Sequence, residues 1–217
     1  MIRLLIGDDH RIVREGLKQV LADAPDMCVV AEAATGPEVL DLVRQQAGSS
    51  EGLQLVLLDI ALPGQDGLEV LQILRREHPG LPVLMLSTYP ENQYAVRCIR
   101  LGAGGYLNKS ADPDDMLAAA RKVAAGGRYL TPAVADALAV AVGHPGGGGL
   151  EALSHREHQV FRLLSAGRTV GEIGAQLKLA PNTVSTYRAR ILEKTGAKND
   201  VELALIAERQ GRTGAGG

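Results

Sequence analysis

The sequence predicts an α/β fold, a doubly wound five-stranded parallel sheet, followed by a second, smaller all-α domain. Across residues 1–125, five short apolar runs alternate with amphipathic stretches of helical periodicity. This alternation requires a parallel sheet that helices cover on both faces. From Leu153 onward only helical periodicity is found, after four consecutive glycines at Gly146–Gly149. A glycine run favours a flexible connection between two domains.

The five short apolar runs are the expected strands. Each has the length of a strand, is rich in Leu, Val or Ile, and stops at turn or polar residues. In chain order the expected strands are Ile2–Gly7, Cys28–Ala33, Leu55–Leu58, Val83–Leu86 and Gly105–Leu107.

A stretch with apolar residues at helical spacing follows each expected strand. In the last one, Asp112 stands where an N-cap is expected and Pro113 takes the first helical position, a common start of helices. The expected helices include Val13–Leu21, Pro37–Gln46, Leu68–Leu74, which Pro79-Gly80 follows, Glu91–Leu101 and Asp112–Ala125.

The domain organisation follows from these patterns. We expect a first domain at residues 1–125, a linker at 126–150, a helical domain at 151–210 and a disordered tail at 211–217. The linker can form a short helix over its Ala- and Val-rich part, before the glycine tether. In the helical domain, the pairs Ser154/Glu157 and Thr169/Glu172 fit a capping box, and Asn199/Glu202 fits a looser version.

Composition excludes several classes of protein. No apolar run approaches the roughly 20 residues of a membrane span, and MIRLLIGDDH lacks the pattern of a signal peptide. Cys28 and Cys98 have neither zinc nor CxxC spacing, so we expect two reduced thiols in a cytoplasmic protein without a membrane partner. Residues 1–150 hold 13 basic and 18 acidic residues, and residues 151–217 hold 10 and 7. This asymmetry suits a cation site joined to a polyanion-binding module.

Charged and polar residues stand at the ends of four expected strands. They are Asp8, Asp9, Asp59, Ser87 and Lys109. Singly, the acids could be turn or helix-cap residues, but in an open α/β sheet the carboxyl ends of the strands meet at the ligand-binding edge. Converging carboxylates repel one another and need a cation, and oxygen-only ligands suit Mg²⁺. Such a site could hold a phosphoryl group on an aspartate nucleophile.

Residues 1–125 resemble a CheY-like receiver domain. Four motifs in order carry the resemblance: IGDDH (6–10), LLDIALPGQDG (57–67), LMLST (84–88) and GYLNKS (105–110). Ile60, Ala61 and Leu62 depart mildly from the family, which often carries Met in this stretch.

The resemblance implies a role for each residue of the site. Asp59 would accept phosphate from a sensor histidine kinase. Asp9, Asp59 and the backbone carbonyl of Ala61 would hold Mg²⁺ directly, and Asp8 would hold it through water. Ser87 and Lys109 would contact the phosphate. Tyr106 would be the rotating aromatic that reports phosphorylation, whereas His10 is usually a bystander in this family.

The stretch Pro181–Thr195 has two different faces. Val184, Tyr187, Ile191 and the stem of Arg188 share one side at helical spacing and should face the domain core. The other face is small and polar near its N-terminal end, as in a helix that enters the major groove. Its candidate base-reading residues are Asn182, Ser185, Thr186 and Ala189, and its candidate phosphate contacts are Thr183, Arg190 and Lys194.

Residues Leu153–Ala207 resemble the LuxR-type helix-turn-helix of NarL/FixJ response regulators. The motifs are LSHREHQVFRLLSAG (153–167), VGEIGAQL (170–177), NTVSTYRARILEKTGAKN (182–199) and DVELALIA (200–207). The resemblance implies binding to double-stranded promoter DNA as a homodimer on an inverted repeat. Val201, Ala204 and Leu205 would form the dimer contact, while Leu203 and Ile206 could instead close the domain core.

Two other classes of function remain open at this point. Phosphatases that form an aspartyl-phosphate also use Asp and Mg²⁺, but they carry a second Asp where this chain has Ala61. A phosphorylation-independent binder typically loses an acid or the lysine, and this chain keeps them all. We therefore expect a response regulator, not a conventional enzyme, whose only catalysis is its own phosphorylation and dephosphorylation.

Overall fold

The structure is a computed structural model that describes residues 1–46, 52–89, 91–143, 150, 153–177 and 179–213. The chain divides into two compact units, Met1–Pro145 and Gly146–Gly217, which are described separately. Among the described residues, no helix combines the length and the apolar character needed to cross a membrane. The predicted glycine tether, Gly146–Gly149, and residues 214–217 of the predicted tail lie outside the described residues. Residues 211–213 of the predicted disordered tail instead continue the last helix, which ends at Thr213, so the tail prediction is wrong for these three residues.

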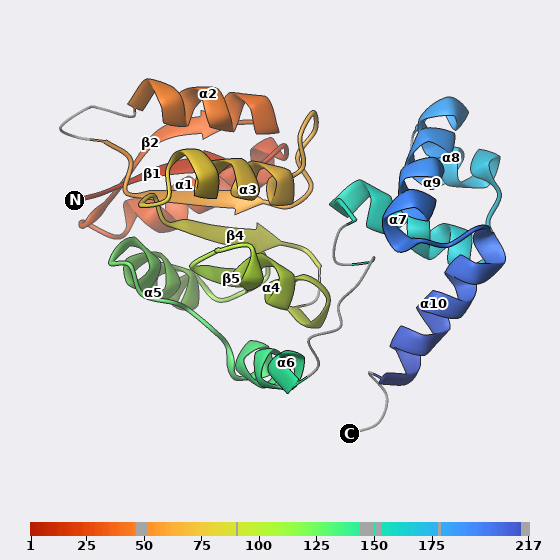
Figure 1. The fold of residues 1–217 in the computed structure, drawn as a ribbon. Coiled ribbons are helices and arrows are strands. Elements are labelled where there is room, and N and C mark those ends of the chain that lie inside the picture. Colours follow the sequence, from red (N-terminus) through yellow and green to blue (C-terminus); the bar gives the residue numbers. More distant parts are fainter. Residues whose placement is uncertain (47–51, 90, 144–149, 151–152, 178, 214–217) are drawn as a thin grey trace. The chain divides into compact units, whose positions relative to one another are not determined.

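The first unit contains a five-stranded, all-parallel sheet (Figure 1). Its strands are β1 (Ile2–Gly7), β2 (Met27–Ala33), β3 (Leu55–Asp59), β4 (Val83–Ser87) and β5 (Gly105–Asn108). They are ordered β2-β1-β3-β4-β5, so β3 is central. The predicted doubly wound fold is confirmed, although three strands extend one residue further than predicted, to Asp59, Ser87 and Asn108.

Six helices belong to this unit within the part of the chain that the structure describes. They are α1 (Arg11–Ala22), α2 (Gly36–Gln46), α3 (Gly67–Glu77), α4 (Glu91–Arg100), α5 (Pro113–Ala124) and α6 (Pro132–Gly143). Two aliphatic cores lie on the two faces of the sheet: α2, α3, α4 and α6 contribute to one, and α1 and α5 to the other. Alternate strand residues divide between them, with Leu5 and Leu58 in the first core and Leu4 and Leu57 in the second, as the pleat of a strand dictates.

The chain after α5 continues to pack on the first unit. The Tyr129 N–H donates to the Gly104 carbonyl at 2.9 Å, and the Thr131 hydroxyl donates to the Glu91 carboxylate at 2.5 Å. In α6, Val134 is buried in the core that contains α4. The segment that the sequence assigns to a linker therefore contains a helix that shares the core of the first unit.

The second unit consists of α7 (His155–Ser165), α8 (Val170–Leu177), α9 (Pro181–Thr195) and α10 (Asp200–Thr213). Its core includes Phe161, Ile173, Val184, Ile191 and Leu203. Glycines end α7 and α9, with φ of 78° at Gly167 and 72° at Gly196, a conformation that glycine adopts without strain.

Side chains cap three helices of the second unit. Ser154 and Glu157 form a complete capping box, and Thr169 and Glu172 bond to each other's backbone N–H at 3.3 and 2.8 Å. Asn199 accepts from the N–H of Glu202, whose carboxylate accepts from Lys198 N–H, so this third pair is the predicted looser version. In the first unit, by contrast, Asp112 occupies the N-cap of α5 without a side-chain hydrogen bond.

Candidate functional site

The parallel sheet brings five polar side chains to one edge. Asp8 and Asp9 follow β1, Asp59 and Ser87 are the last residues of β3 and β4, and Lys109 follows β5. Because β1, β3, β4 and β5 are consecutive in the sheet, their carboxyl ends converge. We call Asp8, Asp9 and Asp59 the acidic cluster.

Lys109 joins two members of the acidic cluster. Its Nζ lies 2.6 Å from Asp8 Oδ2 and 2.9 Å from Asp59 Oδ2, and its side chain is only 9% exposed. Burial opposes the charge on the ammonium, but attraction to the two carboxylates is stronger and raises the pKa of Lys109. The two carboxylates therefore favour the charged form of the lysine at the ends of β1 and β3.

Asp59 is a buried nucleophile candidate at the end of the central strand, with 3% of its side chain exposed. Burial raises the pKa of Asp59, the Lys109 charge and the Ala61 backbone N–H oppose that rise, and the Asp8 charge adds to it. The chain turns tightly here, because a Cβ at Gly67 would lie 2.0 Å from the Asp59 carbonyl oxygen. Gly67 thus lets α3 start against the backbone of Asp59.

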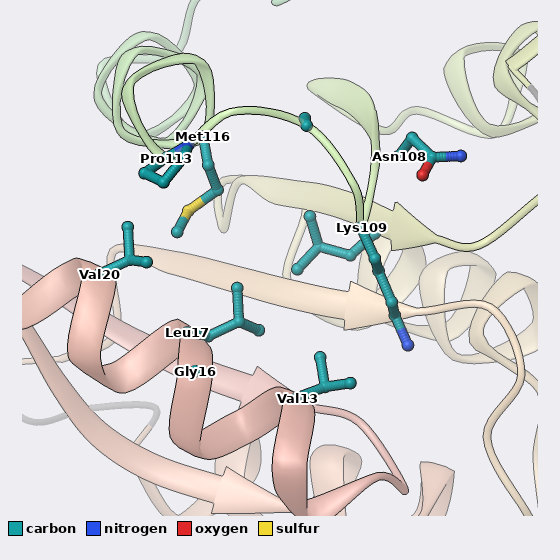
Figure 2. Close-up of a pocket in the computed structure, with 10 residues that line it drawn as sticks. Val13, Gly16, Leu17, Val20, Asn108, Lys109, Pro113 and Met116 are labelled. Carbon is teal, nitrogen blue, oxygen red and sulfur yellow. The ribbon is translucent and has the colours of Figure 1, made fainter.

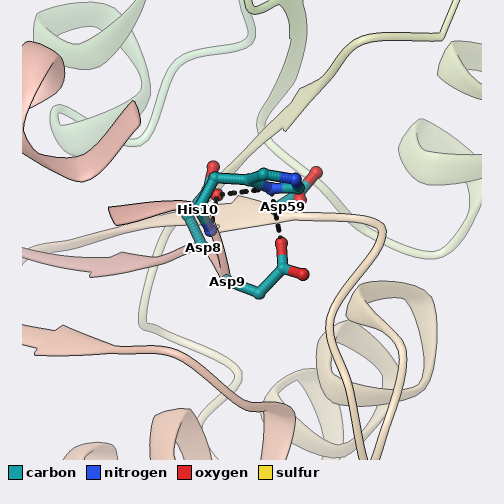
Figure 3. Close-up of side chains that lie close together, drawn as sticks. All are labelled: Asp8, Asp9, His10 and Asp59. Atoms are coloured by element: carbon teal, nitrogen blue, oxygen red, sulfur yellow. Dashed lines mark hydrogen bonds and ion pairs between the residues drawn. The ribbon is translucent and has the colours of Figure 1, made fainter. Parts of the chain in front are cut away.

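The acidic cluster has a donor set that fits a divalent cation. Asp8, Asp9, His10 and Asp59 each offer a ligand atom, and these atoms lie within 4.8 Å of one another. In Figure 3, His10 lies against Asp8 and Asp9, with Nδ1 2.7 Å from Asp9 Oδ1. Three carboxylates suit Mg²⁺, a hard cation that prefers oxygen ligands. The set is therefore compatible with Mg²⁺ without any contribution from the His10 nitrogen.

Ser87 and Tyr106 both form hydrogen bonds with the backbone of the segment that follows β4. The Tyr89 N–H donates to Ser87 Oγ at 3.1 Å, and the Tyr106 hydroxyl donates to the Tyr89 carbonyl at 2.8 Å. Tyr106 is buried, and this burial raises the pKa of its phenol. A hydrogen bond with Ser87 lowers the pKa and offsets part of that rise. Both side chains thus bond to the backbone of Tyr89, so a displacement of Ser87 that moves Tyr89 would also move the acceptor of the Tyr106 hydroxyl.

A cavity of about 310 Å³ lies between α1 and α5, beside the site (Figure 2). Its walls include Val13, Leu17, Val20 and Met116, together with Lys109. In Figure 2 the Lys109 stem extends along this cavity. The lysine therefore has an apolar neighbourhood on one side and carboxylates at its tip, which is consistent with its low exposure.

The structure brings in two residues that sequence patterns did not single out. Arg14 Nη1 donates to the Asp8 carbonyl at 2.6 Å. The Asn108 amide donates to the Tyr89 carbonyl at 3.2 Å, and its oxygen accepts from Ser110. Arg14 lies one helical turn into α1, and Asn108 lies inside the GYLNKS motif, directly before Lys109. Their positions near or within the motifs are the signal that could have suggested them.

The predicted recognition face of α9 is largely exposed. Asn182, Ser185, Thr186, Ala189 and Arg190 are exposed and Thr183 is half-buried, whereas Val184 and Ile191 are fully buried. The Thr186 hydroxyl donates to the Asn182 carbonyl at 3.0 Å. Its proton is therefore used within the helix, which leaves the methyl group and the oxygen lone pairs for an outside partner.

Lys194 has a partner inside the second unit. Its Nζ lies 2.6 Å from Glu157 Oε2, and the Glu157 side chain is only 2% exposed. The same carboxylate oxygen accepts from the Ser154 N–H at 2.7 Å. A buried carboxylate thus joins the start of α7 to the end of α9, so the Lys194 ammonium is not free in this structure.

The last helix carries the exposed apolar residues of the predicted dimer contact. Val201 is 70% exposed and Leu205 is 49% exposed, and Ala204 is half-buried. Leu203 is fully buried and Ile206 packs against the core of the unit. One face of α10 therefore packs on the core of the second unit, and the other face is exposed.

Comparisons with known proteins agree with this architecture. A family model described as the response regulator receiver domain matches residues 4–121, and one described as bacterial regulatory proteins of the luxR family matches residues 151–207. Response regulator GacA of Pseudomonas viridiflava is 38% identical over 217 residues, or 99% of both chains. Transcriptional regulatory protein UhpA of Escherichia coli K12 is 41% identical over 205 residues, or 94% of this chain and 96% of UhpA.

Solved structures give the same result. Response regulator ChrA of a heme-sensing two-component system is 33% identical, with a TM-score of 0.51, and the match covers 96% of this chain and 97% of ChrA. A response regulator RcsB–DNA complex, at 23% identity, shares the fold with a TM-score of 0.58 over 95% of this chain and 98% of that chain. The chain therefore belongs to the NarL/FixJ family of two-component response regulators, in which a receiver domain precedes a LuxR-type helix-turn-helix DNA-binding domain.

Proposed function

We propose that this cytoplasmic regulator accepts a phosphoryl group on Asp59 from a sensor histidine kinase, and that the phosphoryl group controls its binding to promoter DNA. The contact of Lys109 with both Asp8 and Asp59 carries this proposal. A nucleophile held beside a buried cation and next to further carboxylates is suited to receive an anionic group in the presence of a metal ion.

The ligands of the metal ion are assigned as the family resemblance implies. Asp9, Asp59 and the Ala61 carbonyl would hold Mg²⁺ directly, and Asp8 would hold it through water. When bound, Mg²⁺ would neutralise the carboxylates and the oxygens of the incoming phosphoryl group. Asp59 must be ionised to act as the nucleophile, so the Lys109 charge, which favours the carboxylate, supports the reaction as well as the fold.

The transfer step forms a bond between an Asp59 carboxylate oxygen and phosphorus. The bond between phosphorus and the kinase histidine nitrogen breaks, and the nitrogen keeps the electron pair. Lys109 and the Ser87 hydroxyl would bind oxygens of the transferred group. Attack by water on the aspartyl-phosphate would later regenerate the carboxylate and release inorganic phosphate.

Tyr106 would carry the change away from the phosphorylated residue. Ser87 accepts from the Tyr89 N–H, and Tyr106 donates to the Tyr89 carbonyl. A Ser87 hydroxyl drawn toward a phosphoryl oxygen would therefore move Tyr89 and change the packing of Tyr106 next to α4.

The second unit would read DNA with α9. Asn182, Ser185, Thr186 and Ala189 would face base edges, and Thr183 and Arg190 would contact phosphates. Lys194 would contribute to phosphate binding only by sharing its ammonium with Glu157. Two copies, paired through Val201, Ala204 and Leu205 of α10, would match an inverted repeat.

Intact-mass measurement after treatment with a small phosphodonor tests the proposal. With Mg²⁺ present, the wild type should gain one phosphoryl group, and Asp59→Asn should gain none. Asp41→Asn, which changes an exposed aspartate, is the matched control and should label like the wild type. Full labelling of Asp59→Asn would contradict the assignment. Continuous turnover of the donor would indicate a phosphatase, and no labelling of any variant would indicate a phosphorylation-independent binder.

A further inference from the structure

Arg14 connects the acidic cluster to the edge of the sheet. Its Nη1 donates to the Asp8 carbonyl at 2.6 Å, and its Nε donates to Glu32 Oε2 at 3.1 Å. The Arg14 side chain is only 15% exposed. Glu32 lies near the end of β2, so the guanidinium spans from the outer strand to the residue that directly follows β1. A planar guanidinium held at two points has a fixed direction.

The Asp8 carbonyl belongs to the peptide from which the Asp9 side chain departs, and the Asp9 carboxylate itself pairs with His10 Nδ1 at 2.7 Å. The Asp8 carbonyl, the Asp9 nitrogen and the Asp9 Cα lie in one peptide plane, so a hydrogen bond that fixes the carbonyl also fixes the start of Asp9. The Asp8 side chain is held separately, by the His10 N–H at 2.8 Å and by Lys109. Among the contacts that the structure describes, Arg14 is thus the side chain that orients the peptide between the two acids.

We infer that Arg14 is a positioning residue of the cation site, which orients the Asp8–Asp9 peptide so that the Asp9 carboxylate faces the metal. The inference rests on the proposed function, because it assumes that the acidic cluster binds Mg²⁺. Groups that orient the ligands of a metal typically change its affinity by about 10–100-fold when they are removed.

The sign of the effect separates positioning from simple charge. Arg14 is a cation near a cation site, so its loss should strengthen Mg²⁺ binding if only Coulomb repulsion mattered. Positioning predicts the opposite, a weaker site. The two explanations therefore make opposite predictions for the same substitution.

Lys18 supplies a matched control on the same helix. Its Nζ pairs with Glu32 at 2.8 Å and with Glu15 at 2.9 Å, and no described contact joins it to Asp8. Lys18→Met and Arg14→Met both remove one positive charge and a bond to Glu32, and Arg14→Met alone also removes the bond to the Asp8 carbonyl.

Calorimetric titration of the full-length protein with MgCl₂ tests the inference without any phosphodonor. We expect about 10–100-fold weaker binding in Arg14→Met and binding within about twofold of wild type in Lys18→Met. Should Arg14→Met fail to fold, Arg14→Lys keeps the positive charge but replaces the planar fork with a single nitrogen, and it should weaken binding in the same direction by a smaller factor.

The outcomes are distinguishable from a failure of the proposed function. If the wild type binds no Mg²⁺, the proposed cation site is wrong and this inference falls with it. If the wild type binds and Arg14→Met binds as tightly as Lys18→Met, or more tightly, the cation site stands and the positioning role of Arg14 is contradicted.

Discussion

Asp59 carries a cost for the folded receiver, because burial raises the pKa of its carboxyl above the usual value. The folded state then binds a proton more readily than the unfolded state does, so this group lowers stability as pH rises above the unfolded value. Lys109 offsets part of the cost.

Replacement of Asp59 by its neutral isostere should therefore stabilise the receiver at neutral pH. We expect Asp59→Asn to gain on the order of 1 kcal/mol at pH 7, or a few degrees in melting temperature. The gain should shrink as pH falls, because the wild-type carboxyl is then protonated. Thermal unfolding from pH 4 to pH 8 measures it, with Asp41→Asn as an exposed control. An Asp59→Asn protein that is less stable than wild type at pH 7 would show that the ion pair outweighs burial.

Unlike Asp59, Lys194 should stabilise the fold, because it pairs with a carboxylate that is already buried. Among the described contacts, Lys194→Met leaves the Glu157 carboxylate with the Ser154 N–H, and it should destabilise the second unit by about 1–2 kcal/mol, less than for a fully buried pair. Lys198→Met, at an exposed lysine, is the matched control and should change stability by less than about 0.5 kcal/mol. Thermal unfolding of residues 146–217 measures both. Equal melting temperatures would mean that the pair contributes nothing and that Lys194 is free to bind phosphates.

At the scale of elements, we expect α9 to read bases with some residues and to position itself on phosphates with others. The Thr186 proton is donated within the helix, so we expect the methyl group to be the part that bases sense. Thr186→Val should keep the operator preference, and Thr186→Ser should weaken it by about 1 kcal/mol or more. Arg190→Ala should instead weaken binding to all sequences and reduce the slope of log affinity against log salt by about one. Binding to specific and random DNA over a salt series tests this division. It is wrong if Thr186→Val loses preference while Thr186→Ser keeps it.

The second prediction at this scale concerns the contribution of α6 to the stability of the first unit. Val134 is buried, and Leu130 and Leu138 pack on the same core, so their removal should cost about 3 kcal/mol of burial. A fragment of residues 1–125 should therefore melt well below one of residues 1–143. Val134→Asp in the longer fragment should reproduce most of the difference. Equal melting temperatures of the two fragments would show that α6 is only loosely attached.

The sequence predicted most elements because their signals are local. Each apolar run followed by Asp, Ser or Lys predicted both a strand and a residue at the carboxyl edge, and the structure places Asp59, Ser87 and Lys109 there. The capping boxes at Ser154 and Thr169 are confirmed for the same reason. Element ends depend on pairing with neighbouring strands, so β3, β4 and β5 extended beyond their apolar residues.

Contacts that depend on the fold could not be predicted in this way. Arg14 reaches Glu32 across 18 residues, and Lys194 reaches Glu157 across 37. No periodicity relates such pairs, because long flexible side chains find partners that only the packed helices provide. The Ala- and Val-rich α6 carries a single charged residue, Asp136, so its pattern did not clearly indicate the face that packs on α4.

At the scale of the whole molecule, the chain that connects the two units includes Gly146–Gly149. A glycine run has too many backbone states to transmit a rigid push. We therefore expect phosphorylation to change the surface of the receiver, so that DNA-binding units are freed and paired. Two paired units bind an inverted repeat with a raised effective concentration, and affinity rises without new contacts in either unit.

The central claim is that a phosphoryl group on Asp59 controls DNA binding, and operator affinity tests it most directly. The measurement compares full-length wild type and Asp59→Asn on an inverted-repeat operator at one salt concentration, with and without a small phosphodonor and Mg²⁺. Wild-type affinity should rise at least about tenfold with the donor, and Asp59→Asn should bind equally in both conditions. If wild-type affinity does not change although the intact mass shows the adduct, or if Asp59→Asn responds like the wild type, the claim is contradicted.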